Sequence, residues 1–271
     1  MWGIRASRVA PSPEEAVAFR LCAHLSRNVP LAIANSYAGR DFHQGRGYRP
    51  RSFAIVPNGV DTDLFKPDAR SRASVREEWG VEADQRVIGV VGRLNPVKGH
   101  EQFLHSARAL IESDSALTFV VVGDGDDVYR ERLLGLSRRL GITKHIMWLG
   151  ERRDMARIYN GLDLLCSAAL SEGFPNVAAE AMSCGTPCVV TDVGDSRRII
   201  GQAGIAVPAG DPIALTEGIK RGLEHSETGD SAATRTWIMR NYSMEEMVRG
   251  TRDLLERVAR GQVPTAQGRC E

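Results

Sequence analysis

The strongest constraint on the fold is a regular alternation of two segment types that begins near residue 86. Short, continuously apolar and β-branched runs recur from there, as expected for strands that are covered on both faces. These predicted strands are 87–91, 118–122, 145–149, 162–166, 187–190 and a weaker one at 204–207. Segments with the apolar spacing of helices lie between them. This order predicts an α/β protein with βαβ units and a Rossmann-like, doubly wound parallel sheet.

The ends of several predicted helices carry capping signals. Asp211 followed by Pro212 is typical of an N-cap and a first helical residue. Gly141 stands where a helix would end in a glycine. Ser243, with Glu246 three positions later, matches a capping box and predicts a helix over residues 243–260. We expect residues 261–271, which are rich in glycine and polar side chains, to be a frayed tail.

The first 57 residues have a different organisation. They contain a predicted helix at 14–25, a strand at 31–34, a short helix at 38–45 and a strand at 53–56. These few elements cannot bury a core of their own, and we therefore interpret them as the end of another domain. The turn signal at residues 57–59 then marks the boundary. The predicted parts are therefore 1–57, 58–240, and a C-terminal helix and tail at 241–271.

Composition and charge exclude several classes of function. The 35 basic and 34 acidic side chains give a net charge of +1, which is too small a field to favour nucleic acid. No run approaches the roughly 20 apolar residues of a membrane-spanning helix, and the N-terminus lacks the apolar segment of a signal peptide. The five cysteines and six histidines fit no metal-binding spacing. We expect a cytoplasmic protein with reduced thiols and no metal site.

Two glycine-containing loops follow predicted strands, where doubly wound sheets bind their ligands. In the loop after 87–91, Gly92, Arg93 and Lys98 could grip a diphosphate from two sides; the alternative is a pair of solvated surface cations. This loop is not a Walker A motif. After 118–122, Gly123 and Gly125 would let the backbone approach a ligand closely; the alternative is an ordinary tight turn. The third glycine of a dinucleotide-binding fingerprint is missing.

The most informative stretch is 171–182. Pro175 is placed to be the first residue of a helix, so backbone N–H groups of residues 174–177 would form an anion site at the helix start. Glu172 precedes this helix and Glu180 lies between one and two turns inside it. Two carboxylates beside a phosphate site are understandable if each accepts hydrogen bonds from sugar hydroxyls. The alternative is two exposed glutamates, which the apolar neighbours of Glu180 disfavour.

These segments together resemble a known family. EGFPNVAAEAMSCGTPCVVTDVG, with Glu172 and Glu180 as its two acids, is similar to the EX7E motif of retaining, family-4-type (group 1) glycosyltransferases of the GT-B fold. GRLNPVKGHEQFL, FVVVGDGD and NGVDTDLFKP add to the match, which covers roughly residues 1–260. The resemblance implies that 58–240 is the nucleotide-sugar-binding domain. It also implies that 1–57 is a remnant of the N-terminal, acceptor-side domain.

The resemblance assigns roles to the loop residues. It implies that Arg93 and Lys98 bind the donor diphosphate, that Glu172 contacts the sugar hydroxyls, and that these three are catalytic. Glu180 would contact the ribose, and Arg152 would stack on the base. Phosphate and sugar would be held by the backbone of a further run: Gly173, Phe174, Pro175, Asn176 and Val177. The donor would be a UDP- or GDP-linked sugar, with no metal or other cofactor.

The implied reaction transfers the sugar to a polysaccharide or glycolipid with retention of anomeric configuration. The early strands of the N-terminal domain, its glycine-rich loop and the histidine near the reacting sugar have no counterpart in the chain. The alternative is therefore a catalytically incomplete nucleotide-sugar-binding module, or one half of a split enzyme. An epimerase on the same fold is disfavoured by the EGFPN context, and a dehydrogenase by the missing GxGxxG. An open sheet edge would favour association through that face, and peripheral attachment to the cytoplasmic membrane face is a second expectation.

Overall fold

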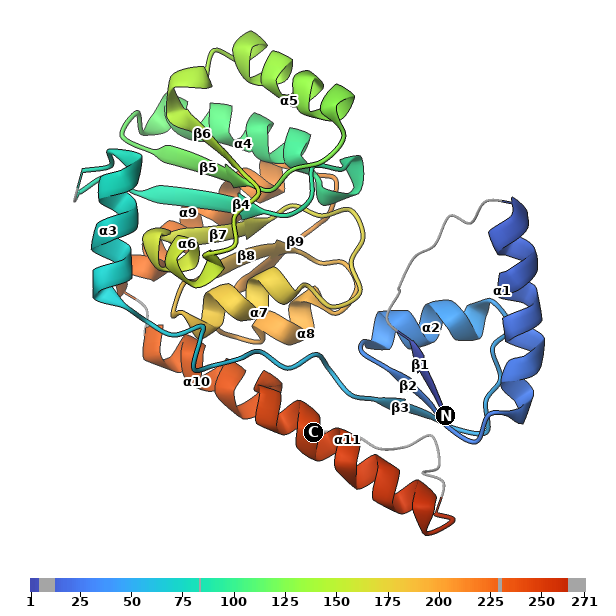
Figure 1. The fold of residues 1–271 in the computed structure, drawn as a ribbon. Coiled ribbons are helices and arrows are strands. Elements are labelled where there is room, and N and C mark those ends of the chain that lie inside the picture. The colour runs from blue at the N-terminus through green and yellow to red at the C-terminus, as the bar shows by residue number, and fades with distance from the viewer. Residues whose placement is uncertain (5–12, 83, 229–230, 263–271) are drawn as a thin grey trace.

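A computed structural model of the chain describes residues 1–4, 13–82, 84–228 and 231–262. It contains a six-stranded sheet that makes up the larger unit and a three-stranded sheet in a smaller N-terminal unit (Figure 1). No helix among the described residues is long and apolar enough to cross a membrane.

The six-stranded sheet confirms the predicted fold class. Its strands are all parallel and lie in the order β6-β5-β4-β7-β8-β9. They are β4 (Val87–Val91), β5 (Thr118–Val122), β6 (Ile146–Gly150), β7 (Leu164–Ser167), β8 (Cys188–Thr191) and β9 (Ile205–Val207). The first two match the predicted bounds, and the others begin one or two residues later. The strand order reverses between β4 and β7, and ligands of doubly wound sheets bind at such a switch point.

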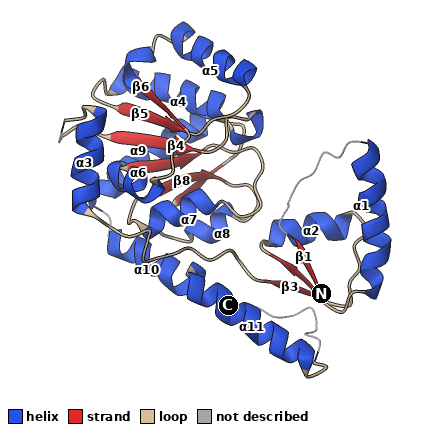
Figure 2. Cartoon of the chain, viewed as in Figure 1, coloured by secondary structure: helices blue, strands red, loops and turns tan. Residues whose placement is uncertain are grey.

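Helices cover both faces of this sheet (Figure 2). In chain order these helices are α3 (Ala69–Trp79), α4 (His100–Ser113), α5 (Asp127–Arg139), α6 (Met155–Gly161), α7 (Asn176–Ser183), α8 (Ser196–Ile200) and α9 (Pro212–Thr228). Two further helices follow, α10 (Ser231–Tyr242), which packs on α7, and α11 (Met244–Ala259), which lies away from the sheet. Successive strand residues point to opposite faces: Ile88 and Val90 enter the core with α4, α5 and α9, and Val87 enters the core with α3, α6 and α7. Burial on both faces explains why the strands read as unbroken apolar runs.

The predicted helix caps are confirmed. The Asp211 carboxylate accepts hydrogen bonds from the backbone N–H groups of Ile213 and Ala214, at 2.9 and 3.0 Å. The Ser243 hydroxyl accepts one from Glu246 N at 3.3 Å, and Gly141 follows α5 with φ at 70°. Four helices, α3, α6, α8 and α10, were not predicted, although α3 is capped by Asp68 at its start and by Gly80, with φ at 64°, at its end.

The N-terminal unit holds three parallel strands in the order β1-β2-β3, namely β1 (Trp2–Ile4), β2 (Ala32–Ala34) and β3 (Phe53–Ile55). Helices α1 (Pro13–Leu25) and α2 (Tyr37–Gly45) accompany them. Its hydrophobic core cluster has few buried members: Ile4, Ala23, Ala32, Ala34 and Tyr48. Strand β1 was not predicted, because its sequence Trp-Gly-Ile contains a glycine and a single β-branched residue.

Polar contacts join this unit to the larger one. The carboxylate of Asp195, which is 6% exposed, accepts hydrogen bonds from the backbone N–H groups of Tyr37 and Ala38, at 2.7 and 3.0 Å. These groups open α2, where a negative charge is favoured by the helix dipole. The guanidinium of Arg198 lies 4.4 Å from the centre of the Tyr37 ring. Asp195 therefore holds the first turn of α2 against the loop that follows β8.

Helix α11 runs from the large unit back toward the N-terminal unit (Figure 1). Its start pairs with the linker, because Val60 forms a β-bridge to Ser243 and Met244 N donates to Val60 O at 2.9 Å. None of the residues of α11 is fully buried, although it carries an apolar stripe. The domain boundaries at residues 57 and 240 stay predictions.

Candidate functional site

A hollow of about 520 Å³ opens at the carboxyl ends of β4, β5 and β6. It brings together five of the predicted site residues: Gly92, Arg93, Gly123, Gly125 and Arg152. Glu151 and Asp124 also line it, so the wall carries both charges. The loops that the sequence singled out after the first three strands of this sheet therefore share one cavity.

The glycines of this hollow are needed by the loops themselves. Leu94 N donates to Asp124 O at 2.9 Å, so the loops after β4 and β5 touch through their backbones. A Cβ on Gly123 would lie 2.8 Å from the carbonyl carbon of Gly92, and one on Gly125 would lie 3.0 Å from that of Leu94. Any side chain there would push the two loops apart. Gly123 and Gly125 were predicted to let the backbone approach a ligand. In the structure, they allow the backbones of the two loops to approach each other.

Lys98 lies beside this hollow, at the end of a short 3₁₀ turn over Pro96–Lys98. Asn95 caps the turn by accepting a hydrogen bond from Val97 N at 2.9 Å. The stem of Lys98 passes Gly92, and its ammonium forms an ion pair with Glu172. The Glu172 side chain is 12% exposed, against 32% for Lys98. Two predicted residues 74 positions apart are therefore in contact at the switch point between β4 and β7.

The segment after Glu172 departs from the prediction in one respect. Helix α7 begins at Asn176, and Pro175 is its N-cap with ψ at 86°, so the prediction that Pro175 is the first helical residue is wrong by one position. The Phe174 ring is 8% exposed and packs at 5.7 Å on the Tyr242 ring. The amide of Asn176 accepts a hydrogen bond from Asn58 Nδ2 at 2.9 Å. These side chains face the core and the linker. Part of the backbone of 173–177 is also bonded within the protein, since Asn176 N donates to Phe174 O at 3.0 Å and Asp195 N donates to Gly173 O at 3.1 Å.

Glu180 is half-buried on α7 and was expected to contact the ribose. Its Oε2 accepts a hydrogen bond from the hydroxyl of Tyr159 at 2.7 Å. Burial raises the pKa of the Glu180 carboxyl, and this hydrogen bond offsets part of the rise. The sequence did not single out Tyr159. In the sequence, Tyr159 is recognisable only as an apolar position of a seven-residue helix, and this does not indicate a hydrogen-bond partner 21 positions away.

Arg152 already has carboxylate partners. Its guanidinium bonds both oxygens of Asp154, at 2.8 and 2.7 Å, and Glu78 Oε1 at 2.7 Å. These bonds raise the pKa of Arg152 and hold that of Asp154 well below its usual range. The edge of the guanidinium is thus occupied, and only its faces are open to a base. Stacking by Arg152 stays a prediction.

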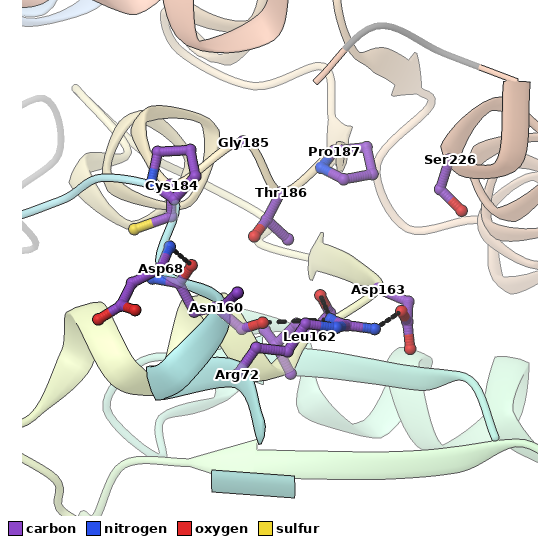
Figure 3. Close-up of a pocket in the computed structure, with 12 residues that line it drawn as sticks. Asp68, Arg72, Asn160, Leu162, Asp163, Cys184, Gly185, Thr186, Pro187 and Ser226 are labelled. Carbon is purple, nitrogen blue, oxygen red and sulfur yellow. Dashed lines mark hydrogen bonds and ion pairs between the residues drawn. The ribbon is translucent and has the colours of Figure 1, made fainter. Parts of the chain in front are cut away.

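A second hollow, of about 270 Å³, lies at the amino ends of β7 and β8 (Figure 3). Its charged groups already have partners within the protein, since Arg72 bonds Asp163 and the carbonyls of Asn160 and Leu162, and the Asp68 carboxylate caps α3. None of the predicted site residues lines it. Doubly wound sheets bind ligands at the opposite end of the strands, so we assign this hollow to the framework.

Comparison with known proteins decides the family. Residues 85–225, just over half of the chain, match the profile of the family "Glycosyl transferases group 1". The chain belongs to this family. The predicted resemblance to group 1 glycosyltransferases is therefore confirmed, and the matched residues span β4 to α9 with every loop of the candidate site.

Individual relatives of this group 1 glycosyltransferase chain cover different shares of it. It is 30% identical over 210 residues to the D-inositol 3-phosphate glycosyltransferase of Corynebacterium urealyticum, covering 74% of this chain and 48% of that protein. It is 30% identical over 154 residues to the UDP-Gal:alpha-D-GlcNAc-diphosphoundecaprenol alpha-1,3-galactosyltransferase of Escherichia coli, covering 56% and 39%. The chain thus spans about half the length of these curated relatives or less.

A solved structure shows the same fold over nearly the whole chain. The crystal structure of Anabaena HepE in complex with UDP and glucose superposes with a TM-score of 0.83 at 23% sequence identity. The match covers 94% of this chain and 71% of HepE. The N-terminal unit and the six-stranded sheet therefore both have counterparts in the fold of HepE.

His100 connects the site to the stability of the protein. It is the first residue of α4, two positions after Lys98, and is 1% exposed. Burial lowers the pKa of its imidazole to about 4; the Asn95 backbone opposes this and the Lys98 charge adds to it. The unfolded chain therefore binds a proton at His100 that the folded chain does not, between pH 6.5 and about 4.

We expect His100 to make the protein acid-sensitive. The effect of His100 on the free energy of unfolding is absent above pH 6.5. As the pH falls toward 4, this effect progressively lowers the free energy of unfolding, by about 3 kcal/mol in full. Urea unfolding at pH 7 and pH 4.5 measures this for the wild type and for His100→Gln, which cannot titrate. A smaller loss of stability between the two pH values is expected for the variant. An equal loss in both proteins would show that His100 is not responsible.

Proposed function

We propose that this chain is the donor-binding half of a retaining glycosyltransferase that takes a UDP- or GDP-linked sugar. The observation that carries the proposal is the Lys98–Glu172 ion pair at the β4–β7 switch point, beside the hollow that Arg93 lines. A cation and an acid for diphosphate and sugar are thus held together, although they come from different loops. The family profile over residues 85–225 supports the same conclusion.

The pair suggests how a donor is received. An arriving diphosphate would replace Glu172 as the partner of Lys98, with Arg93 providing a second cation from the neighbouring hollow. Glu172 would then be released to accept hydrogen bonds from the sugar hydroxyls. Because Lys98 and Arg93 stabilise the charge that develops on the leaving diphosphate, they favour cleavage of the bond to the sugar. Attack by the acceptor on the face that the diphosphate leaves would retain the anomeric configuration.

The remaining predicted residues fit the nucleoside. The hollow at the ends of β4, β5 and β6 would take the base, beside Arg152 and Glu151. Glu180 would accept hydrogen bonds from the ribose hydroxyls. The backbone of residues 173–177 would hold the phosphate and the sugar at the start of α7. No metal is needed in this scheme, because the two cations balance the diphosphate charge.

We propose a glycan or glycolipid acceptor and a cytoplasmic protein that works at the membrane face. The name of the second relative supports this acceptor class, since it names a diphosphoundecaprenol-linked sugar, whereas the inositol phosphate in the name of the first is a small polyol phosphate. The N-terminal unit would form part of the acceptor side. A three-stranded sheet offers little surface for an acceptor, which favours the second candidate: a nucleotide-sugar-binding module, or one half of a split enzyme.

We expect the purified chain to bind UDP or GDP weakly and to transfer sugar poorly or not at all. The donor loops are in place, but the acceptor side has only the small N-terminal unit among the described residues. Calorimetry with UDP and GDP measures binding, and release of UDP or GDP from a sugar donor in the presence of acceptor measures transfer. Robust transfer by the chain alone would reject the second candidate. No detectable binding of either nucleotide would reject the donor-binding proposal.

A further inference from the structure

Tyr159 is the largest fully buried side chain in the described part of the chain. It lies on α6, between the core of the large unit and α7. Thr186 Oγ1 donates to the Tyr159 carbonyl at 2.8 Å, and the Phe65 ring lies 5.9 Å from the Tyr159 ring. Thr186 thus fixes the backbone of Tyr159, and Phe65 and the surrounding core cluster hold the ring, which sets the direction of its hydroxyl.

That hydroxyl donates to Oε2 of Glu180 at 2.7 Å, the residue that was predicted to contact the ribose. A buried hydroxyl needs a hydrogen-bond partner, and an ionised carboxylate is a stronger acceptor than any neutral group. Burial raises the pKa of Tyr159 well above its usual range, so the phenol remains protonated and can only donate to this carboxylate. In this contact Tyr159 is therefore always the donor and Glu180 always the acceptor.

The contact has a consequence for the other carboxylate oxygen. A glutamate side chain loses considerable rotamer freedom when it is ordered. If Glu180 were mobile before binding, this entropy cost would weaken the binding of the ligand. The contact to Tyr159 removes that freedom in advance. Among the described residues, the one hydrogen bond to this carboxylate uses Oε2, which leaves Oε1 for a ligand.

We propose that Tyr159 is a positioning residue of the donor site, which holds Glu180 so that Oε1 meets the ribose hydroxyls of the nucleotide. This inference rests on the proposed function, because it assumes that a nucleotide occupies the site. It goes further in assigning a specific task to a core residue that touches no ligand. The hydroxyl of Tyr159 then acts on affinity only through Glu180, and only on ligands that carry ribose hydroxyls.

Tyr159→Phe tests the proposal, because it removes the hydroxyl and keeps the ring. The probes are UDP and 2′,3′-dideoxy-UDP, titrated by calorimetry into the full chain. The wild type is expected to prefer UDP, and Tyr159→Phe to lose about tenfold of affinity for UDP with little change for the dideoxy compound. If Tyr159 had only a structural role, the variant would lose affinity for both nucleotides to the same extent. Tyr129→Phe, a change of another buried tyrosine on α5, is the matched control and should leave both affinities unchanged.

A double-mutant cycle completes the test. In a Glu180→Gln background, Tyr159→Phe is expected to change UDP affinity less than twofold, because its route of action is gone. Undiminished preference for UDP in Tyr159→Phe would overturn the inference and leave the proposed function intact. Failure of the wild type to bind either nucleotide would instead overturn the proposed function. If Tyr159→Phe does not fold, Glu180→Gln alone decides, since unchanged preference for UDP in that variant also overturns the inference.

Discussion

Replacement of Gly99 by alanine is expected to lower the free energy of unfolding by at least about 3 kcal/mol. Gly99 has φ at +70°, a conformation that disfavours any Cβ. A Cβ there would also lie 2.7 Å from the carbonyl carbon of Ala168 and closer still to its oxygen. Both obstacles are backbone, so no side-chain rotation can relieve them. The turn that carries Lys98 would have to move away from the loop after β7.

Gly141→Ala is the matched control for this prediction. Gly141 has the same φ of +70°, but no atom lies within 4 Å of the position that a Cβ would take. It should cost about 1 kcal/mol, the backbone penalty by itself. Urea unfolding of the two variants and the wild type measures both values, and their difference isolates the clash with Ala168. Equal losses in the two variants would contradict the packing argument.

Replacement of Lys98 by alanine is expected to weaken nucleoside diphosphate binding by about 1.5–3 kcal/mol, or roughly 10- to 150-fold. The variant loses a charge-assisted hydrogen bond to the diphosphate. It also leaves the 12% exposed Glu172 without its cation, so an uncompensated negative charge would face the phosphates. Both effects act in the same direction, which makes this the largest expected change in affinity.

Calorimetric titration with UDP or GDP measures the loss for Lys98→Ala. The control is Lys144→Ala, since Lys144 is exposed in the 3₁₀ turn before β6, at the end of the sheet away from the site. This control should bind like the wild type, which separates a local contact from a general change in charge. Unchanged affinity in Lys98→Ala would reject the role of Lys98 in the diphosphate clamp.

The sequence was sufficient for the sheet of the large unit and for the loops that carry its site. Strands covered on both faces must be apolar at every position, and that requirement is visible in any one run such as 118–122. Parallel strands joined by helices place their carboxyl ends at one edge, so the loops at Arg93 and Gly123 could be expected to meet. Caps such as Asp211 were predictable because their hydrogen bonds join residues two or three positions apart.

Features with weak local signals escaped prediction. Strand β1 reads Trp-Gly-Ile, with a glycine at its centre, and α3 is mostly polar with only three buried positions, so neither shows a clear apolar pattern. Pro175 was placed one position too far into α7, because proline fits both the N-cap and the first turn and its ψ angle decides between them. The domain boundaries and the role of each site residue remain predictions.

What the sequence by itself determined is the set of chemical groups at the site and the sheet end where they gather. Only the tertiary structure decided how those groups are paired: Lys98 with Glu172, Tyr159 with Glu180, and Asp195 with the start of α2. These partners lie 74, 21 and 158 positions apart. Local patterns arise from the short repeat of helices and strands, whereas such pairs depend on how whole elements pack. The charge pairing of the proposed donor site is therefore a property of the folded chain.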